Sequence, residues 1–253
     1  MLRIANVTMH FGGIAALQNV SLDVMPGGIY SIIGPNGAGK TTLFNCISGI
    51  YRARSGSITF KGKELIGTKA HKISQMGIAR AFQNIELFKG MTVLDNLMSA
   101  RGFLHHYGLL AATLYLGRCA REERKCRDRV EEVIELLDLQ KCRKTPVGAL
   151  SYGVQKRVEL GRALTMEPEM VLIDEPVSGM NLEETEDMAR YILDVNEERN
   201  ITVLLIEHDM GLVMDLSDRV TVLNFGVKIA EGSPDEIARN PEVISAYLGR
   251  QQS

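Results

Sequence analysis

Short apolar runs with the period of a strand divide the first third of the chain. Val20, Leu22 and Val24 alternate with polar residues, as in a half-buried strand. Residues 2–9 also predict a strand, but their apolar positions change phase partway, which predicts an irregularity. Glycine- and proline-rich turns are predicted at 11–13, 26–28, 55–57 and 61–63, with a short strand at 58–60. This part of the chain therefore predicts antiparallel hairpins.

A continuous apolar run at Ile29–Ile33 predicts a buried strand among these hairpins. Helical spacing follows at Leu43, Phe44, Ile47 and Ile50. The strand and the helix are joined by Gly34, Pro35, Asn36, Gly37, Ala38, Gly39, Lys40, Thr41 and Thr42. This segment has the G-x-x-x-x-G-K-T pattern of a phosphate-binding loop.

The strand–turn–helix context gives this glycine-rich loop a chemical meaning. It aims backbone N–H groups and a helix N-terminus at an anion. Gly37 and Gly39 carry no side chain to keep phosphate oxygens away from the backbone. We expect Lys40 to reach the outer phosphates and the Thr41 hydroxyl to hold Mg²⁺. The alternative, a structural glycine turn with an exposed lysine, does not account for the coincidence of pattern, strand and helix.

Helical periodicity dominates from residue 92 to about 165. Apolar residues at i, i+3 and i+4 spacing mark two stretches, 93–98 and 130–137, and a third helical stretch is predicted at 150–164. Residues 118–129 are densely charged, which favours a solvated helix face over a binding surface. Beyond this region, apolar runs at 170–173 and 202–206 predict strands of a parallel sheet.

Polar residues of catalytic type follow both of these strands. Asp174 and Glu175 come directly after the first, and Glu207, His208 and Asp209 after the second. Ligands of open parallel sheets bind at the carboxyl ends of the strands. We expect one of the two carboxylates, Asp174 or Glu175, to coordinate Mg²⁺ directly or indirectly, and the second to polarise an attacking water. The alternative, exposed turn carboxylates and a structural histidine, is the weaker interpretation beside a phosphate-binding loop.

Composition narrows the function classes further. The chain has 253 residues, 45% hydrophobic, with a formal net charge of −2, so it lacks the basic field of a dedicated nucleic-acid binder. No apolar stretch is long enough to cross a bilayer, and the N-terminus lacks a signal-peptide pattern. Cys46, Cys119, Cys126 and Cys142 have no metal-type spacing and read as reduced cytosolic thiols. Any membrane role must therefore come through a partner.

Together these motifs resemble an ABC-type ATPase, the nucleotide-binding subunit of an ATP-binding-cassette transporter, over essentially all 253 residues. Residues 34–42 match the family's Walker A motif, and residues 171–175 match Walker B with the catalytic glutamate. Gln83 matches the Q-loop glutamine, His208 the switch histidine and Phe11 the aromatic residue that stacks on adenine. Residues 150–155 occupy the signature position and residues 178–181 the D-loop position.

The resemblance implies a P-loop NTPase (RecA-like) α/β core with a parallel sheet, an antiparallel β subdomain and a helical subdomain. It implies one domain over 1–253, with 1–84 and 158–253 as the core and 85–157 as the helical subdomain. ATP and Mg²⁺ would be the ligands, with Thr41, Gln83 and Asp174 at the metal. Glu175 and His208 would be catalytic.

Three departures from the family pattern concern the contacts between two cassettes. Tyr152 stands where the signature motif has a glycine and Val154 where it has a glutamine, while Ser151 and Gly153 keep a hydroxyl and a close backbone for a γ-phosphate. Asn181 replaces the D-loop aspartate, which keeps an acceptor and loses a charge. We expect the function to survive and signalling between the two sites to be altered.

The closer resemblance is to the ATPase subunits of bacterial branched-chain amino-acid importers, through residues 11–13, 44–49, 80–83, 151–153 and 205–210 and the tail from 231 to 249. It implies a second ATPase subunit, transmembrane permeases and, indirectly, a periplasmic or extracellular solute-binding protein, with no nucleic-acid partner. The location would be the cytoplasmic face of the inner membrane. Importers of urea or amides share much of this pattern, so the solute stays open.

Other functions leave part of the sequence unexplained. A soluble ABC ATPase of translation or DNA repair lacks support because the chain has one cassette, no long coiled-coil insertion and no basic tract. A small-molecule kinase accounts for 34–42 but not for 150–153 or His208. A scaffold without turnover does not account for Glu175. We also predict a helical stretch after Gln83 in which Leu87 and Phe88 form a groove for the permease.

Overall fold

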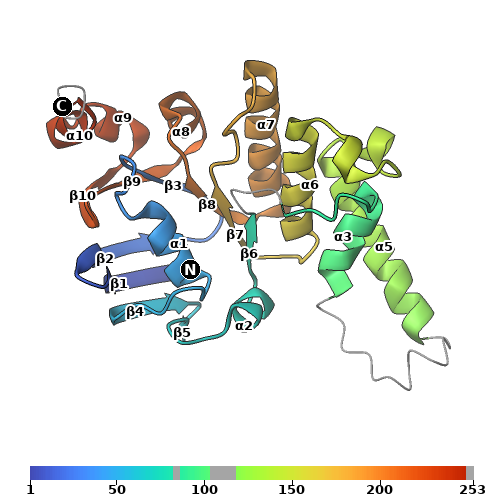
Figure 1. Cartoon of the computed structure of the whole chain (residues 1–253), viewed down its shortest axis with the longest axis horizontal. Coiled ribbons are helices and arrows are strands. Elements are labelled where there is room, and N and C mark those ends of the chain that lie inside the picture. The colour runs from blue at the N-terminus through green and yellow to red at the C-terminus, as the bar shows by residue number, and fades with distance from the viewer. Residues whose placement is uncertain (82–85, 103–117, 249–253) are drawn as a thin grey trace.

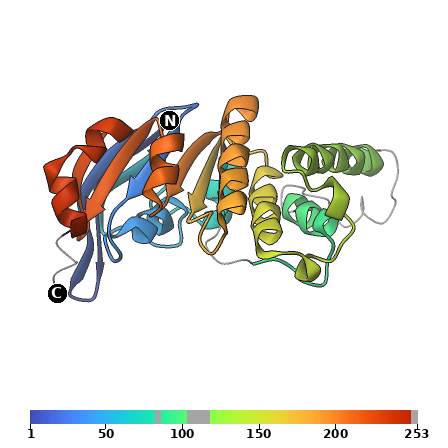
Figure 2. The ribbon, with the colours of Figure 1, turned by 90° about the horizontal axis from the view of Figure 1, so that it is seen from above.

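The computed structural model describes residues 1–81, 86–102 and 118–248. Two sheets and a separate group of helices make up the fold (Figure 1). Viewed from above, the helix group lies beyond one edge of the larger sheet, and the C-terminal helices lie at the other edge (Figure 2). The predicted combination of a parallel core, antiparallel strands and a helical part is confirmed.

The larger sheet has six strands in the order β10-β9-β3-β8-β7-β6. Their bounds are Val227–Gly232 for β10, Arg219–Asn224 for β9, Ile29–Ile33 for β3, Thr202–Ile206 for β8, Met170–Asp174 for β7 and Ile78–Ala81 for β6. All neighbouring strands are parallel except β10, which pairs antiparallel with β9. The predicted strands at 29–33, 170–173 and 202–206 are confirmed, whereas β6, β9 and β10 were not predicted.

Both faces of this sheet are covered, which explains why its central strands are apolar without alternation. Val171 and Ile173 of β7 belong to one buried cluster, and Met170 and Leu172 belong to the other. Every residue of β7 and β8 is buried. The carboxyl ends of β3, β8 and β7, which are neighbours in the sheet, therefore present their following residues at one edge.

The smaller sheet is antiparallel, in the order β2-β1-β4-β5, with bounds Ile14–Val24, Leu2–Phe11, Ser55–Phe60 and Lys63–Glu64. The predicted irregularity is confirmed: Asn6 has a φ of 50°, and the pairing of β1 with β2 shifts between Ile4 and Val7. The predicted turn at 55–57 is wrong, because these residues begin β4. Gly56 lies where the pairing of β1 with β4 shifts, so the glycine accompanies a bulge instead of a chain reversal.

Helix α1 (Lys40–Ile47) follows the glycine-rich loop, as predicted. The predicted extension to Ile50 is wrong: Ser48 is the C-cap, Gly49 has a φ of 74°, and Ile50 is exposed. A second helix, α2 (Ala70–Gln75), contacts β6. Apolar side chains of α1 pack with both sheets in a single cluster that includes Leu43 and Phe44. The loop is therefore anchored on a rigid element.

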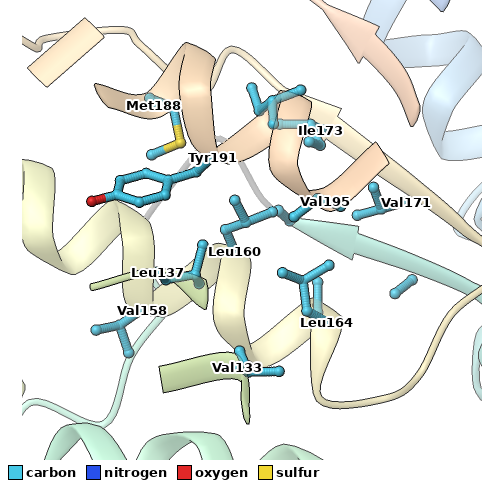
Figure 3. Close-up of a cluster of buried hydrophobic side chains, with 14 of the residues drawn as sticks. Val133, Leu137, Val158, Leu160, Leu164, Val171, Ile173, Met188, Tyr191 and Val195 are labelled. Atoms are coloured by element: carbon cyan, nitrogen blue, oxygen red, sulfur yellow. The ribbon is translucent and has the colours of Figure 1, made fainter. Parts of the chain in front are cut away.

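The helix group contains α3 (Val93–Gly102), α5 (Arg118–Leu136) and α6 (Tyr152–Leu164), with single turns at Gln140–Cys142 and Val147–Ala149. Helix α6 begins two residues later than predicted, because Ser151 is its N-cap. Leu160 and Leu164 of α6 meet Tyr191 and Val195 of α7 (Leu182–Arg199) in the cluster that joins this group to β7 (Figure 3). The division at 84/85 and 157/158 stays a prediction.

The C-terminal part adds α8 (Met210–Leu216), α9 (Pro234–Ala238) and α10 (Pro241–Leu248) around β9 and β10. Val213, Val222 and Ile237 belong to the small cluster that holds them there. Asn224 pairs with Val227, so β9 and β10 are joined by a two-residue turn at Phe225 and Gly226.

Candidate functional site

A cavity of about 470 Å³ opens over the glycine-rich loop. The loop and the start of α1 form its floor through residues 36–42, and Glu175 reaches it from the end of β7. The remaining lining comes from β2 and from the turn after β9: Ile14, Ala15, Ala16, Gln18 and Phe225. The structure thus brings the predicted phosphate loop and the predicted catalytic carboxylate to one cavity.

The loop conformation depends on a glycine at 39 because of packing. Gly39 has a φ of 102°, and a Cβ placed there would lie 2.5 Å from the Ala16 carbonyl oxygen. The sequence interpretation gave this glycine the task of exposing the backbone to phosphate. The structure adds that it lets the loop press against β2. Gly37, with a φ of 80°, has open space where a Cβ would lie, so it fits the phosphate-facing role.

Lys40 is buried at the head of α1. Its Nζ donates to the carbonyl oxygens of Gly34, at 2.6 Å, and Pro35, at 3.3 Å, at the start of the loop. The ammonium group is therefore already held inside the loop before an anion is added. Thr41, one residue further, is exposed on the cavity floor, where its hydroxyl is accessible.

Asp174 and Glu175 lie in different environments although they are adjacent. Asp174 is buried, and burial raises the pKa of its carboxyl against the lowering effect of Arg80, which donates to its Oδ2 at 2.8 Å. The charges of Glu175 and Lys40 also act on it, in opposite directions. Glu175 has a φ of 50°, an uncommon conformation that turns the chain directly after the strand.

The loop after β8 is built around the buried carboxylate of Glu207. It accepts backbone hydrogen bonds from Val177 at 3.3 Å, His208 at 2.7 Å and Asp209 at 3.2 Å. These bonds tie the end of β8 to the segment that follows Glu175. The His208 side chain is exposed, with its Nδ1 3.5 Å from Glu207 Oε2. It follows the strand beside β7, as predicted, but does not line the cavity.

The signature-like residues form the start of α6 in the helix group. Ser151 is the N-cap, and its Oγ accepts from Val154 N at 3.5 Å. Gly153 is buried against the start of α7, where a Cβ would lie 2.5 Å from Glu184 Oε1. Ser151 and Gly153 do not line the cavity over the loop. The structure therefore does not bring them to the phosphate loop of the same chain.

Asn181 has a local structural task at the position of the D-loop aspartate. It is the N-cap of α7, its Oδ1 accepts from Glu184 N at 3.0 Å, and Glu184 Oε2 accepts from Asn181 N at 3.2 Å. Asparagine and aspartate are both strong N-caps, so the amide keeps this capping box intact. Tyr152 packs beside Gly179, in the turn that precedes α7. The three departures thus lie close to one another.

The structure does not test two of the predicted nucleotide contacts, Phe11 and Gln83. Phe11 ends β1, and its ring forms a T-shaped pair with the ring of Tyr51 at a centroid distance of 5.2 Å. It pairs with Ile14 but does not line the cavity itself. Gln83 lies outside the described residues. The adenine-stacking role of Phe11 and the role of Gln83 stay predictions.

Sequence reasoning missed Arg80 and Phe225. Arg80 is on a four-residue strand that was too short to stand out, and only its pairing with β7 brings it to Asp174. The β9–β10 turn has a usable signal, since Phe225-Gly226 separates two apolar runs. Nothing local in that signal connects the turn with a loop nearly 190 positions earlier.

Comparisons with known proteins agree with this geometry. A family model described as "ABC transporter" matches residues 17–178, and one described as "Branched-chain amino acid ATP-binding cassette transporter" matches residues 227–252. The high-affinity branched-chain amino acid transport ATP-binding protein BraF of Pseudomonas aeruginosa is 41% identical and matches 98% of each chain. The chain therefore belongs to the ABC transporter family, as a member of its ATP-hydrolysing cassettes.

Solved structures support the same assignment. The ADP conformation of MJ1267, an ATP-binding cassette of an ABC transporter, matches with a TM-score of 0.86 and 33% identity over 98% of each chain. A dimeric structure of MJ0796, a bacterial ABC transporter cassette, matches with a TM-score of 0.78 and 25% identity over 92% of this chain and 99% of that one. In the described ranges, no helix combines the length and apolarity needed to cross a bilayer.

Proposed function

We propose that this chain is the ATP-hydrolysing subunit of an importer for branched-chain amino acids. The observation that carries the catalytic part is the single cavity shared by Lys40, Thr41 and Glu175. The observation that carries the solute is the near full-length similarity to BraF, together with the match of the C-terminal segment.

In the proposed reaction the loop backbone and Lys40 hold the ATP phosphates. Lys40 exchanges its bonds to the Gly34 and Pro35 carbonyls for bonds to the outer phosphates. Glu175, at the cavity wall, orients a water and takes its proton while the water oxygen bonds to the γ-phosphorus and the bond from that phosphorus to the bridging oxygen breaks, which releases ADP and phosphate. His208, which comes shortly after the adjacent strand β8, contacts the γ-phosphate. Positioning and electrostatic stabilisation supply most of the acceleration.

The residues at the strand ends fit a magnesium ion. Within the described chain, Asp174 Oδ1 is buried and has no hydrogen-bond partner, which leaves an oxygen for a ligand. The Thr41 hydroxyl is a second oxygen donor on the cavity floor. We propose that these two groups hold Mg²⁺, with Gln83 as a third. When bound there, the ion would neutralise the negative charge that develops on the phosphate oxygens.

We further propose that two cassettes act as a head-to-tail dimer, each completing the other's site. Ser151 and Gly153 lie outside the cavity of their own chain, at the start of the 13-residue helix α6. A helix N-terminus with a hydroxyl and close backbone suits the γ-phosphate of a neighbouring chain. The dimeric structure of MJ0796, a related cassette, supports the pairing of two cassettes. The partner is a second copy or a related ATPase.

The proposed permease contact needs one correction. Leu87 is 9% exposed and belongs to the core that joins the helix group to the sheet, so it is not part of an open groove. Residues 86–91 are also not helical, contrary to the prediction. Phe88 and Met91 remain exposed at 54% and 43%. We propose these two side chains as the apolar contact with a permease, which would hold the cassette at the cytoplasmic face of the inner membrane.

Reconstitution tests the whole proposal. The chain would be coexpressed with permease subunits of a branched-chain amino-acid importer, with and without a second ATPase subunit. Uptake of labelled leucine into proteoliposomes would be followed with the solute-binding protein present. ATP-dependent leucine uptake that stops in a Glu175→Gln complex is the expected result. Uptake of urea or an amide in place of leucine would assign the related importer class. ATP hydrolysis without any permease association would favour a soluble ABC ATPase.

A further inference from the structure

The turn at Phe225 and Gly226 holds an exposed aromatic ring at the cavity. Neither the proposed catalytic residues nor the predicted base contact explains this ring. Phe225 is 68% exposed, the most exposed aromatic side chain in the described part of the chain. It lines the cavity over the phosphate loop. A large apolar surface exposed at a ligand cavity is available for contact with the ligand.

The backbone at Phe225 strengthens this indication. Phe225 has a φ of 45° and Gly226 a φ of 79° in a two-residue hairpin turn. Turns with positive φ at both central residues favour Asn-Gly, because asparagine tolerates the left-handed region far better than a bulky residue. A phenylalanine held in this conformation is an outlier that points to a function for its ring.

The turn is fixed to the site on two sides. Gly226 N donates to the Ala38 carbonyl oxygen of the phosphate loop at 3.0 Å. Gln18 of β2 donates from its backbone to Gly226 O at 2.8 Å and from its side chain to Phe225 O at 3.2 Å. A Cβ at Gly226 would lie 2.7 Å from the Ala16 carbonyl oxygen, so only glycine fits there. The position of the ring relative to the loop is therefore set by the backbone.

A second exposed apolar side chain shares the cavity wall. Ile14, at the start of β2, is 74% exposed and lines the same cavity. With Ala16 it gives the wall beside the phosphate loop an apolar character. The loop accounts for phosphates, and this wall has the chemistry for the flat, weakly polar part of a nucleotide.

We infer that Phe225, with Ile14, contacts the nucleoside part of the bound nucleotide, the base and its ribose. Phe225 is thus a positioning residue that adds affinity for adenosine phosphates over bare phosphate chains. The inference rests on nucleotide binding at the phosphate loop, which belongs to the proposed function. Phe11 lies on the neighbouring hairpin against Tyr51 and outside the cavity lining, so its contribution can be separated by substitution.

The test compares Mg-ADP with inorganic tripolyphosphate by calorimetry on the full chain. Phe225→Asn removes the ring and suits the left-handed turn, so its melting temperature should not fall below that of the wild type. We expect Mg-ADP affinity to drop roughly 5- to 150-fold, the range for losing one base–aromatic contact, with tripolyphosphate affinity unchanged. Phe225→Tyr keeps an aromatic ring and should bind Mg-ADP like the wild type. Phe88→Asn is the matched control at an exposed phenylalanine outside the cavity, and it should leave Mg-ADP affinity unchanged.

Three outcomes would overturn the inference. One is wild-type Mg-ADP affinity in Phe225→Asn with a loss in Phe11→Ala alone, which would leave Phe11 as the base contact. Another is an equal loss for Mg-ADP and tripolyphosphate, which would mean that Phe225 only shapes the loop. The third is a defect confined to ATP-driven dimer formation, which would assign the ring to the subunit interface. A wild-type chain that binds Mg-ADP with this Phe225 dependence but hydrolyses no ATP would instead defeat the proposed function and leave the inference standing.

Discussion

Arg80 and Asp174 form a buried ion pair, with Nη2 2.8 Å from Oδ2 and side chains 9% and 1% exposed. The same guanidinium donates from Nη1 to Asn45 Oδ1 at 2.6 Å and Ser48 Oγ at 3.2 Å, near the end of α1. Arg80 thus connects the helix that follows the phosphate loop with the strand that ends at Asp174 and leads into Glu175. The pair holds Asp174 Oδ2 and leaves Oδ1 for the proposed magnesium ion.

Replacing Arg80 by leucine should destabilise the fold strongly. Removing one partner of a buried ion pair leaves the other charge buried without compensation, which typically costs about 3–5 kcal/mol. Urea denaturation followed by circular dichroism measures the loss. The double variant Arg80→Leu/Asp174→Asn removes both charges and should recover most of it. If the losses of unfolding free energy in the two single variants simply add in the double variant, the pair does not couple the two strands.

The loss of stability in the single variant Arg80→Leu should depend on pH. Burial raises the pKa of the Asp174 carboxyl, against the opposing hydrogen bond and charge of Arg80. A carboxyl with a raised pKa in the folded state makes stability fall as pH rises through the interval between its unfolded and folded pKa values. Without Arg80 the folded pKa rises further. The deficit of Arg80→Leu should therefore be largest at neutral pH and shrink on acidification; a deficit independent of pH would contradict this account.

Lys40→Ala should abolish tight ATP binding while the chain stays folded. The substitution removes the ammonium that the loop holds between the Gly34 and Pro35 carbonyls and that the outer phosphates would take over. Calorimetry with ATP measures the effect, and Lys61→Ala, at an exposed lysine paired with Glu169, serves as the control. Unchanged ATP affinity would remove the phosphate loop from the proposed site.

Glu175→Gln should slow ATP hydrolysis roughly 10²- to 10⁴-fold, the range for losing a positioned general base. The amide keeps the shape of the side chain, so ATP binding should survive and the ATP-bound dimer should accumulate on gel filtration. Phosphate release at saturating ATP is the readout. Turnover near that of the wild type would mean that another group activates the water.

Phe88→Asp should weaken the cassette–permease complex without unfolding the cassette. The side chain is half exposed, with the Arg162 guanidinium 5.7 Å from its ring centroid, so a carboxylate there stays solvated in the free chain. Against an apolar permease surface the same carboxylate would be buried at high cost. Copurification from detergent extract measures the loss. Leu87→Asp is the contrasting variant, which should unfold the isolated cassette because Leu87 is in the core; wild-type copurification of Phe88→Asp would refute this contact.

Local patterns carried most of the site prediction because its residues sit at the ends of regular elements. The apolar run of β3 and the helical spacing of α1 bracket the phosphate loop, so the loop was readable without any long-range contact. Asp174 ends a fully buried strand, and Glu175 and His208 come shortly after such strands, so these residues were readable for the same reason. The errors at 55–57 and at Ile50 arose because glycine marks bulges and helix ends as well as turns.

The sequence by itself determined the chemistry of this protein: a phosphate loop, two carboxylates after one strand, a histidine after another and a family assignment from motifs in order. Tertiary structure decided which of these groups share a space. Strand order brought the ends of β3 and β7 to one cavity, and pairing of β6 with β7 placed Arg80 on Asp174. It also buried Leu87, left Phe88 exposed and set Phe225 beside the loop, because burial and long-range pairing depend on the packing of distant segments and not on local period.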